Sequence, residues 1–251
     1  MNSFIKSIFI AGVSGFLTSW IGLFIGIQSS AFMKSKERRF KGTVLGILGG
    51  FTLGIVFFDL LPDSFEAGSI YIAITGIAVG LIISVYLDGK LSHYEVPTLE
   101  DKSNSFLKAS IFMSIGIGIH NLPSGIALGS LISATPVVGL QLAIALILHG
   151  IPEGLTLGIF FRECDAPKSR LILIPVITSI PMGLGAIVGG ALLKSPFFIS
   201  ISLSFAAAMI LYITLRETLP SANDTWKGRL TTIGDVVGVI AGMLLVSFFH
   251  A

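Results

Sequence analysis

The chain has 251 residues, of which 53% are hydrophobic and only 12% are charged. Soluble domains carry about 25% charged residues, so this composition excludes a soluble globular protein and indicates a polytopic membrane protein. The net charge of +2 identifies no partner, and the single cysteine, Cys164, excludes an internal disulfide and a cysteine-rich metal site.

Eight apolar segments are long enough to cross a bilayer, because a spanning helix needs about 20 mostly apolar residues. In chain order they cover residues 8–27, 43–61, 69–87, 109–128, 136–160, 171–193, 197–215 and 232–249. The first is longer than the apolar region of a signal peptide and lacks an A-x-A cleavage site, so we expect a retained span. The runs are continuous rather than alternating, which favours helices over barrel strands. The prediction is an all-α fold with a single transmembrane domain over residues 1–251.

The basic residues orient these spans. All of the 16 Lys and Arg residues except Lys6 and Lys194 lie in the connections that follow odd-numbered spans. Cytoplasmic loops carry an excess of Lys and Arg. We therefore expect a multi-pass protein of the cell (cytoplasmic) membrane with both termini on the extracytoplasmic side.

Two pairs of similar motifs indicate internal symmetry. The second span ends in DLLP (59–62) and the seventh in ETLP (217–220), while the fourth and fifth contain HNLPSG (120–125) and HGIPEG (149–154). In each pair the two helices run in opposite directions. Similar sequences on oppositely directed helices are typical of inverted repeats, so we expect a 3+2+3 arrangement in which spans four and five form the centre.

The central motifs place ionisable groups where they are costly and usually mark a site. His149 and Glu153 are four residues apart and share one helix face. His120 lies on the preceding helix, which the short connection makes an antiparallel neighbour. A single His-Pro step is compatible with a simple kink, but two copies with an added Glu favour a His₂Glu set for Zn²⁺ or a similar divalent ion. The carbonyl of Asn121 adds a weak oxygen ligand or orients a water.

Carboxylates at the span ends leave two interpretations each. Asp59 and Asp63 are either a solvated helix end or an acidic entrance that attracts cations. Glu217 forms either a simple ion pair with Arg216 or a ligand on an exit path.

Taken together, the paired motifs, the eight spans and the two carboxylate-x-Leu-Pro ends resemble the ZIP (Zrt/Irt-like) family of divalent metal transporters over essentially the whole chain. The resemblance implies import of Zn²⁺, or of Fe²⁺, Mn²⁺ or Cd²⁺, as a transported substrate rather than a cofactor, and no enzymatic activity. It identifies the metal-binding residues as His120, Asn121, His149 and Glu153. Glu217 matches the acid of an exit pair whose usual histidine is Arg216 here.

Three positions depart from the family pattern, because Ser124, Gly150 and Ile180 stand where carboxylates help form a second, adjoining metal site. The resemblance therefore implies a mononuclear centre. One carboxylate leaves a divalent ion with about one uncompensated positive charge in a low dielectric, so we expect weaker binding and a wetter site.

Two alternatives remain open. The missing carboxylates are compatible with a transport-dead relative that senses metal or acts as a scaffold. A His₂Glu set with an open position also occurs in hydrolytic zinc enzymes, although an intramembrane metalloenzyme would be expected to show H-E-x-x-H rather than H-x-x-x-E. The expected partners are metal ions and the lipid bilayer; a homodimer is compatible with the sequence, and nothing in it points to nucleic acid.

Overall fold

Long helices make up the described part of the protein, and eight of them are long and apolar enough to cross a membrane. The structure, a computed structural model, describes residues 3–33, 35–92, 101–192 and 196–250, and within those ranges it contains helices and no strand. The helices able to cross a membrane are Lys6–Met33, Arg38–Ala67, Ile70–Lys90, Phe106–Ser133, Pro136–Glu163, Lys168–Ala191, Pro196–Thr225 and Arg229–Phe248. Each overlaps one predicted span, so the all-α polytopic fold is confirmed. Lys194 and the last residue of the sixth predicted span lie outside the described residues.

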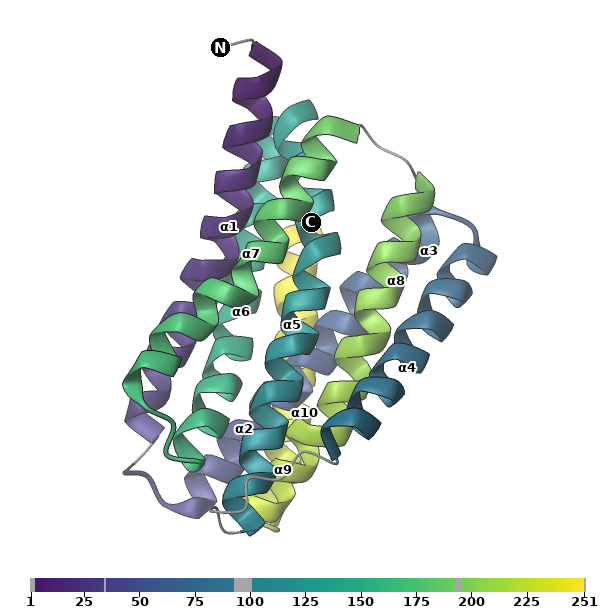
Figure 1. The fold of residues 1–251 in the computed structure, drawn as a ribbon. Helices are drawn as coiled ribbons and strands as arrows, with labels where there is room; N and C mark the ends of the chain where they lie inside the picture. Colours follow the sequence, from purple (N-terminus) through teal and green to yellow (C-terminus); the bar gives the residue numbers. More distant parts are fainter. Residues whose placement is uncertain (1–2, 34, 93–100, 193–195, 251) are drawn as a thin grey trace.

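Two of the spans are built from two helices joined by a single π-helical turn. Figure 1 labels the α-helices in the fold. The elements are α1 (Ser3–Ser29), the 3₁₀ turn η1 (Ser30–Met33), α2 (Arg38–Ile55), the π turn η2 (Val56–Leu60), α3 (Leu61–Ala67), α4 (Ile70–Ser92), α5 (Asp101–Ala134), α6 (Pro136–Glu163), α7 (Lys168–Leu192), α8 (Pro196–Ile213), the π turn η3 (Thr214–Thr218), α9 (Leu219–Thr225) and α10 (Arg229–His250).

The helices pack as two groups of four spans. In the first, which we call the histidine group, α1 and α5 each pack on α6 and α7. In the second, the π-turn group, α2 packs on α10 and α4 packs on α8. The groups meet chiefly where α5 lies against α8. The pairing follows the predicted inverted repeat: the first span packs on the fifth as the sixth packs on the fourth, and the second packs on the eighth as the seventh packs on the third.

The π turns occupy equivalent positions in the two repeats. Each comes directly before a Leu-Pro step, at Pro62 and Pro220. Proline lacks the N–H that would donate to the carbonyl four residues earlier, and the wider turn accommodates the missing bond. π turns occur frequently at functional sites. Here they contain the two carboxylates of the repeated motif, Asp59 and Glu217.

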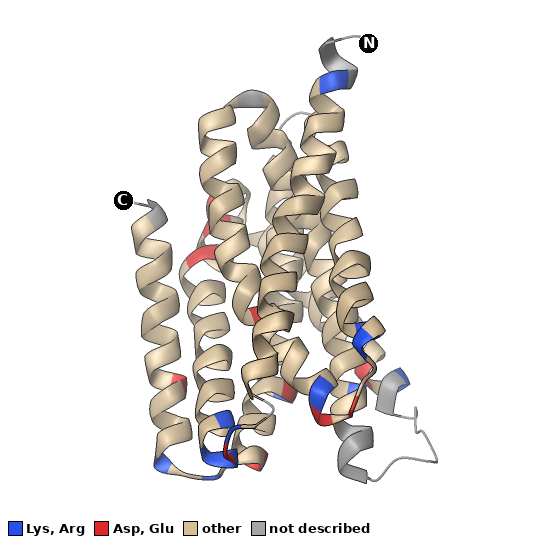
Figure 2. Ribbon diagram, turned by 90° about the vertical axis from the view of Figure 1, so that its left-hand side faces the viewer, with Lys and Arg blue, Asp and Glu red and all other residues tan. Residues whose placement is uncertain are grey.

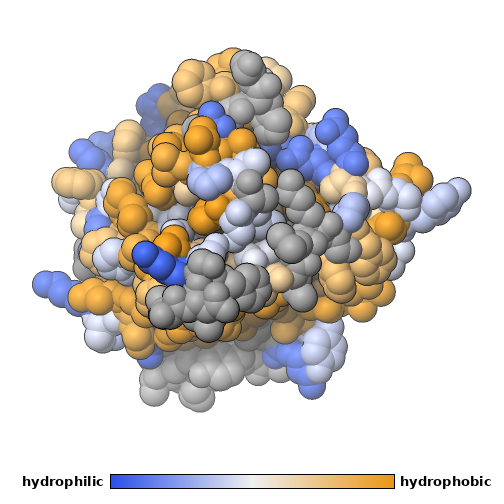
Figure 3. All heavy atoms as spheres, turned by 90° about the horizontal axis from the view of Figure 1, so that it is seen from above, coloured by the Kyte–Doolittle hydropathy of each residue, from blue (hydrophilic) through white to orange (hydrophobic). Residues whose placement is uncertain are grey.

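Charge and hydropathy match a protein embedded in lipid. Large apolar side chains are exposed along the bundle, including Tyr71 (80%) and Ile82 (68%) on α4, and hydrophobic residues make up much of the end face in Figure 3. Apart from Lys6 in the first turns of α1, the Lys and Arg residues that the structure describes gather toward the end opposite the N-terminus (Figure 2). We call this the basic end. The opposite end, where α1 begins and α10 ends, we call the terminal end.

Candidate metal centre

Three buried side chains from two antiparallel helices converge in the middle of the bundle. Ligand atoms of His120 on α5 and of His149 and Glu153 on α6 all lie within 4.8 Å of one another. Nε2 of His149 is 3.1 Å from Oε1 of Glu153, and the two imidazole centroids are 5.8 Å apart. The exposed fractions of His120, His149 and Glu153 are 1%, 8% and 6%, respectively. The structure thus brings together the histidines and the glutamate that the sequence places on facing helices.

The imidazoles lack the hydrogen bonds expected of core histidines. Nδ1 of His120 and both ring nitrogens of His149 are buried without a hydrogen-bond partner. The contact between His149 and Glu153 has the distance of an ion pair but not the alignment of a hydrogen bond. Buried polar atoms are rarely left without a partner. Nitrogen lone pairs beside a carboxylate are a donor set that a divalent cation such as Zn²⁺ accepts, so the arrangement does not fit a kink with satisfied imidazoles.

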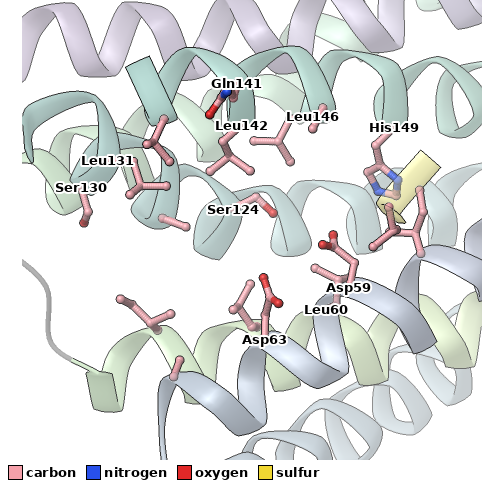
Figure 4. A pocket seen from close by; sticks show the side chains of 18 of the residues that line it. Asp59, Leu60, Asp63, Ser124, Ser130, Leu131, Gln141, Leu142, Leu146 and His149 are labelled. Atoms are coloured by element: carbon pink, nitrogen blue, oxygen red, sulfur yellow. The ribbon is translucent and has the colours of Figure 1, made fainter. Parts of the chain in front are cut away.

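A cavity of about 730 Å³ leads from the terminal end to the two histidines. Its mouth lies where the last turns of α5 meet the first turns of α6 and α8, and its floor includes His120 and His149. Asp59 and Asp63 point into it from the π-turn group, opposite Ser124 (Figure 4).

A third carboxylate, Glu66, also lines this cavity. Sequence reasoning missed it, although its offsets of three residues from Asp63 and seven from Asp59 place all three on one helix face. The cavity therefore combines an acidic wall with imidazoles at its floor.

On the other side of Glu153 the bundle is nearly closed. The pocket there has a volume of only about 20 Å³, roughly the space of a single water. Its lining is mostly apolar and threonine side chains from α2, α5, α6 and α8–η3, with Ile117 and Ile213 among them. Farther toward the basic end, Nζ of Lys41 on α2 lies 2.6 Å from Oε1 of Glu163 on α6, which joins the two helix groups. Among the described residues, the large cavity therefore connects the central cluster to the terminal end, and the pocket on the basic side of the cluster holds only about 20 Å³.

Asn121 has a different environment from its neighbour His120. Its side-chain amide nitrogen donates to Oγ of Ser19 at 3.0 Å and to the carbonyl oxygen of Thr178 at 2.7 Å. Its assignment as an oxygen ligand stays a prediction.

The three positions that depart from the family pattern lie in different surroundings. Ser124 lines the cavity of about 730 Å³ that leads to the histidines, which we call the outer cavity. Gly150 packs on α1, where a Cβ atom would lie 3.3 Å from the Cα of Gly22. Ile180 is 46% exposed on the outer face of α7, so a carboxylate at this position would face away from the histidines. Of the three, position 124 is the one that lines the cavity leading to the cluster.

The motif at the basic end is arranged differently from a simple pair between Arg216 and Glu217. Nε of Arg216 lies 3.0 Å from Oδ2 of Asp88 on α4, and the hydroxyl of Tyr212 donates to the same oxygen at 2.7 Å. Glu217 is half-buried in η3 and does not join the central cluster. Asp88 was not foreseen, because no local pattern links it to a residue 128 positions away.

Comparisons with known proteins identify the family of this chain. A family model described as "ZIP Zinc transporter" matches residues 87–250. The chain is 31% identical to the zinc transporter ZupT of Streptococcus mutans over 259 residues, covering 92% of this chain and 94% of the relative. It is also 31% identical to ZupT of Akkermansia muciniphila over 262 residues, with 92% and 94% covered, and 26% identical to ZupT of Corynebacterium aurimucosum over 249 residues, with 92% of each covered. The chain therefore belongs to the ZIP zinc transporter family, a family of multi-pass membrane transporters rather than enzymes.

Proposed function

We propose that this protein imports a divalent cation, Zn²⁺ in the first place, across the cell membrane through one central metal site formed by His120, His149 and Glu153. The observation that carries the proposal is the convergence of these buried groups, with three imidazole nitrogens that make no hydrogen bond, at the floor of a cavity open to one end. The bias of Lys and Arg makes the basic end cytoplasmic. The cavity and both termini then face outward.

The acidic wall supplies the first part of the path. Asp59 and Asp63 raise the local concentration of cations in the cavity, since clefts lined by one sign of charge focus the field. A cation then loses part of its hydration shell to imidazole and carboxylate ligands. Release follows when the two helix groups rearrange to open the basic end. Glu217 in η3 is the counterpart there of Asp59 in η2.

A mononuclear site is favoured by the surroundings of the centre. Gly150 packs closely on α1, and Ile180 faces outward. Ser124 offers a hydroxyl rather than a carboxylate. A single carboxylate binds a divalent ion less tightly than a pair would, and a transported ion has to leave again.

Zinc flux into proteoliposomes tests the proposal. We expect His149→Ala and Glu153→Gln to reduce initial Zn²⁺ uptake at least tenfold, while Glu37→Gln, an exposed carboxylate ahead of α2, serves as the matched control. Competition by Cd²⁺, Fe²⁺ and Mn²⁺ ranks the substrates. Unchanged uptake in both site variants would refute the site, and zinc binding without flux in the unaltered protein would support a metal sensor instead.

A further inference from the structure

We propose that Asn121, together with Ser19 and Ser179, forms a clamp that sets the orientation of His120 toward the metal, so that these are positioning residues rather than ligands. The inference rests on the proposed function, since it concerns the same site. It assigns to Asn121 a different part from that of the oxygen ligand implied by the family pattern.

The clamp is a buried hydrogen-bond network that joins α1, α5 and α7. The Asn121 amide nitrogen on α5 contacts Oγ of Ser19 on α1 at 3.0 Å and the Thr178 carbonyl on α7 at 2.7 Å. Oγ of Ser179 on α7 lies 2.9 Å from Oγ of Ser19. None of these four side chains is more than 4% exposed. In a bilayer such groups have no water as an alternative partner, so the network holds the three helices in one arrangement.

The orientation of the amide follows from the Thr178 contact. A backbone carbonyl only accepts hydrogen bonds, so the atom of Asn121 that faces it has to be the nitrogen. Among the described residues, Asn121 also lines neither the outer cavity nor the pocket below Glu153. The amide nitrogen is therefore directed into the contacts with α1 and α7, and the side chain borders neither of the two spaces through which we expect a cation to travel.

The clamp lies where interior prolines interrupt the backbone hydrogen bonds of α5 and α7. Pro123 interrupts the hydrogen bonds of α5 directly after His120 and Asn121. Pro175 and Pro181 interrupt α7 on either side of Thr178. Each interior proline removes a backbone hydrogen bond and kinks or loosens the helix.

His120 and Asn121 are consecutive, and consecutive helical side chains are about 100° apart around the axis. Fixing the amide of Asn121 against α1 and α7 therefore fixes the direction in which the His120 imidazole leaves α5.

Replacement of Asn121 by aspartate separates the two roles by the sign of the effect. An added carboxylate ligand would tighten Zn²⁺ binding. In a clamp, the carboxylate oxygen would face the Thr178 carbonyl and lose a donor, so we expect Asn121→Asp to weaken Zn²⁺ binding at least tenfold. Calorimetric Zn²⁺ titration of the purified full chain gives the dissociation constant, and the visible spectrum of bound Co²⁺ reports a change in ligand geometry.

Ser19→Ala keeps the proposal testable if the aspartate variant does not fold. We expect it to raise the Zn²⁺ dissociation constant about threefold to tenfold and to alter the Co²⁺ spectrum. Ser114→Ala is the matched control, because Ser114 lies on α5, the helix of His120 and Asn121, and its hydroxyl donates to the Ser110 carbonyl within that helix.

The outcomes separate this clamp from the site itself. Tighter Zn²⁺ binding in Asn121→Asp, or unaltered affinity and spectrum in Ser19→Ala, would overturn the clamp. Retained zinc uptake in the His149 and Glu153 variants would instead overturn the proposed function.

Discussion

Adding a carboxylate at position 124 tests whether missing charge limits metal binding. Ser124 lines the outer cavity one helical turn after His120, and its hydroxyl donates to the His120 carbonyl at 3.3 Å. The position therefore has room for a longer side chain that reaches toward the cluster. We predict that Ser124→Glu binds Zn²⁺ more tightly than the unaltered protein and transports it more slowly.

The size of the effect follows from the distance of one turn. A carboxylate about 6 Å from a divalent cation gains about 5 kcal/mol at an effective dielectric constant of about 20. Desolvation of the added carboxylate removes several kcal/mol of this gain. A net gain of about 2 kcal/mol corresponds to a dissociation constant about thirtyfold lower. Release from the tighter site should reduce the maximal uptake rate.

Calorimetric titration and zinc flux measure the two effects on the same preparation. Ser124→Gln is the matched control, since it adds similar volume without charge. If Ser124→Glu and Ser124→Gln bound Zn²⁺ equally, the idea that uncompensated charge weakens this site would be refuted.

Three further predictions concern the path and the packing. Lys41→Gln removes the 2.6 Å ion pair with Glu163 that joins the helix groups at the basic end. Because loss of this pair should favour opening at the basic end and closure of the outer cavity, a cysteine placed in that cavity should react about threefold more slowly with an impermeant thiol reagent. An unchanged rate would show that the pair does not hold the cavity open outward. Gly22→Ala would place a Cβ atom 2.6 Å from the Ile147 carbonyl and should lower Tm by about 5 °C in a thermal melt; an unaltered Tm would mean that α1 moves aside freely. Asp59→Asn combined with Asp63→Asn should raise the KM for Zn²⁺ about threefold at low ionic strength and less at high salt; the same increase at both salt concentrations would argue against attraction by the acidic wall.

The span pattern and the central cluster were predictable because they depend on short-range regularities. Continuous apolar runs specify spanning helices, and the four-residue spacing of His149 and Glu153 specifies a shared face. The short connection then places His120 opposite them. Most of the observed helices extend beyond the predicted spans at one end or both, since polar turns at their ends continue the helix without adding to the apolar run.

Other features depend on packing that no local pattern records. The sequence shows the repeated carboxylate-x-Leu-Pro motif, but not that each copy sits at a π turn. Ser19 carries no signal of its own, because isolated hydroxyls are ordinary in apolar helices. Its importance depends on how α1 is rotated against α5. The outward direction of Ile180 likewise depends on the rotation of α7. The small pocket on the basic side of Glu153 is a feature of one conformational state. The sequence specifies every state of a transporter, so it does not predict which of them a structure will show.

X-ray absorption at the zinc edge of the zinc-loaded protein tests the central claim most directly. We expect one zinc per chain with two imidazole nitrogens at about 2.0–2.1 Å and carboxylate oxygen in the remaining shell, and one imidazole fewer in His149→Ala. A spectrum without imidazole scattering, or one that the His149→Ala change leaves unaltered, would contradict a cation site formed by these facing helices.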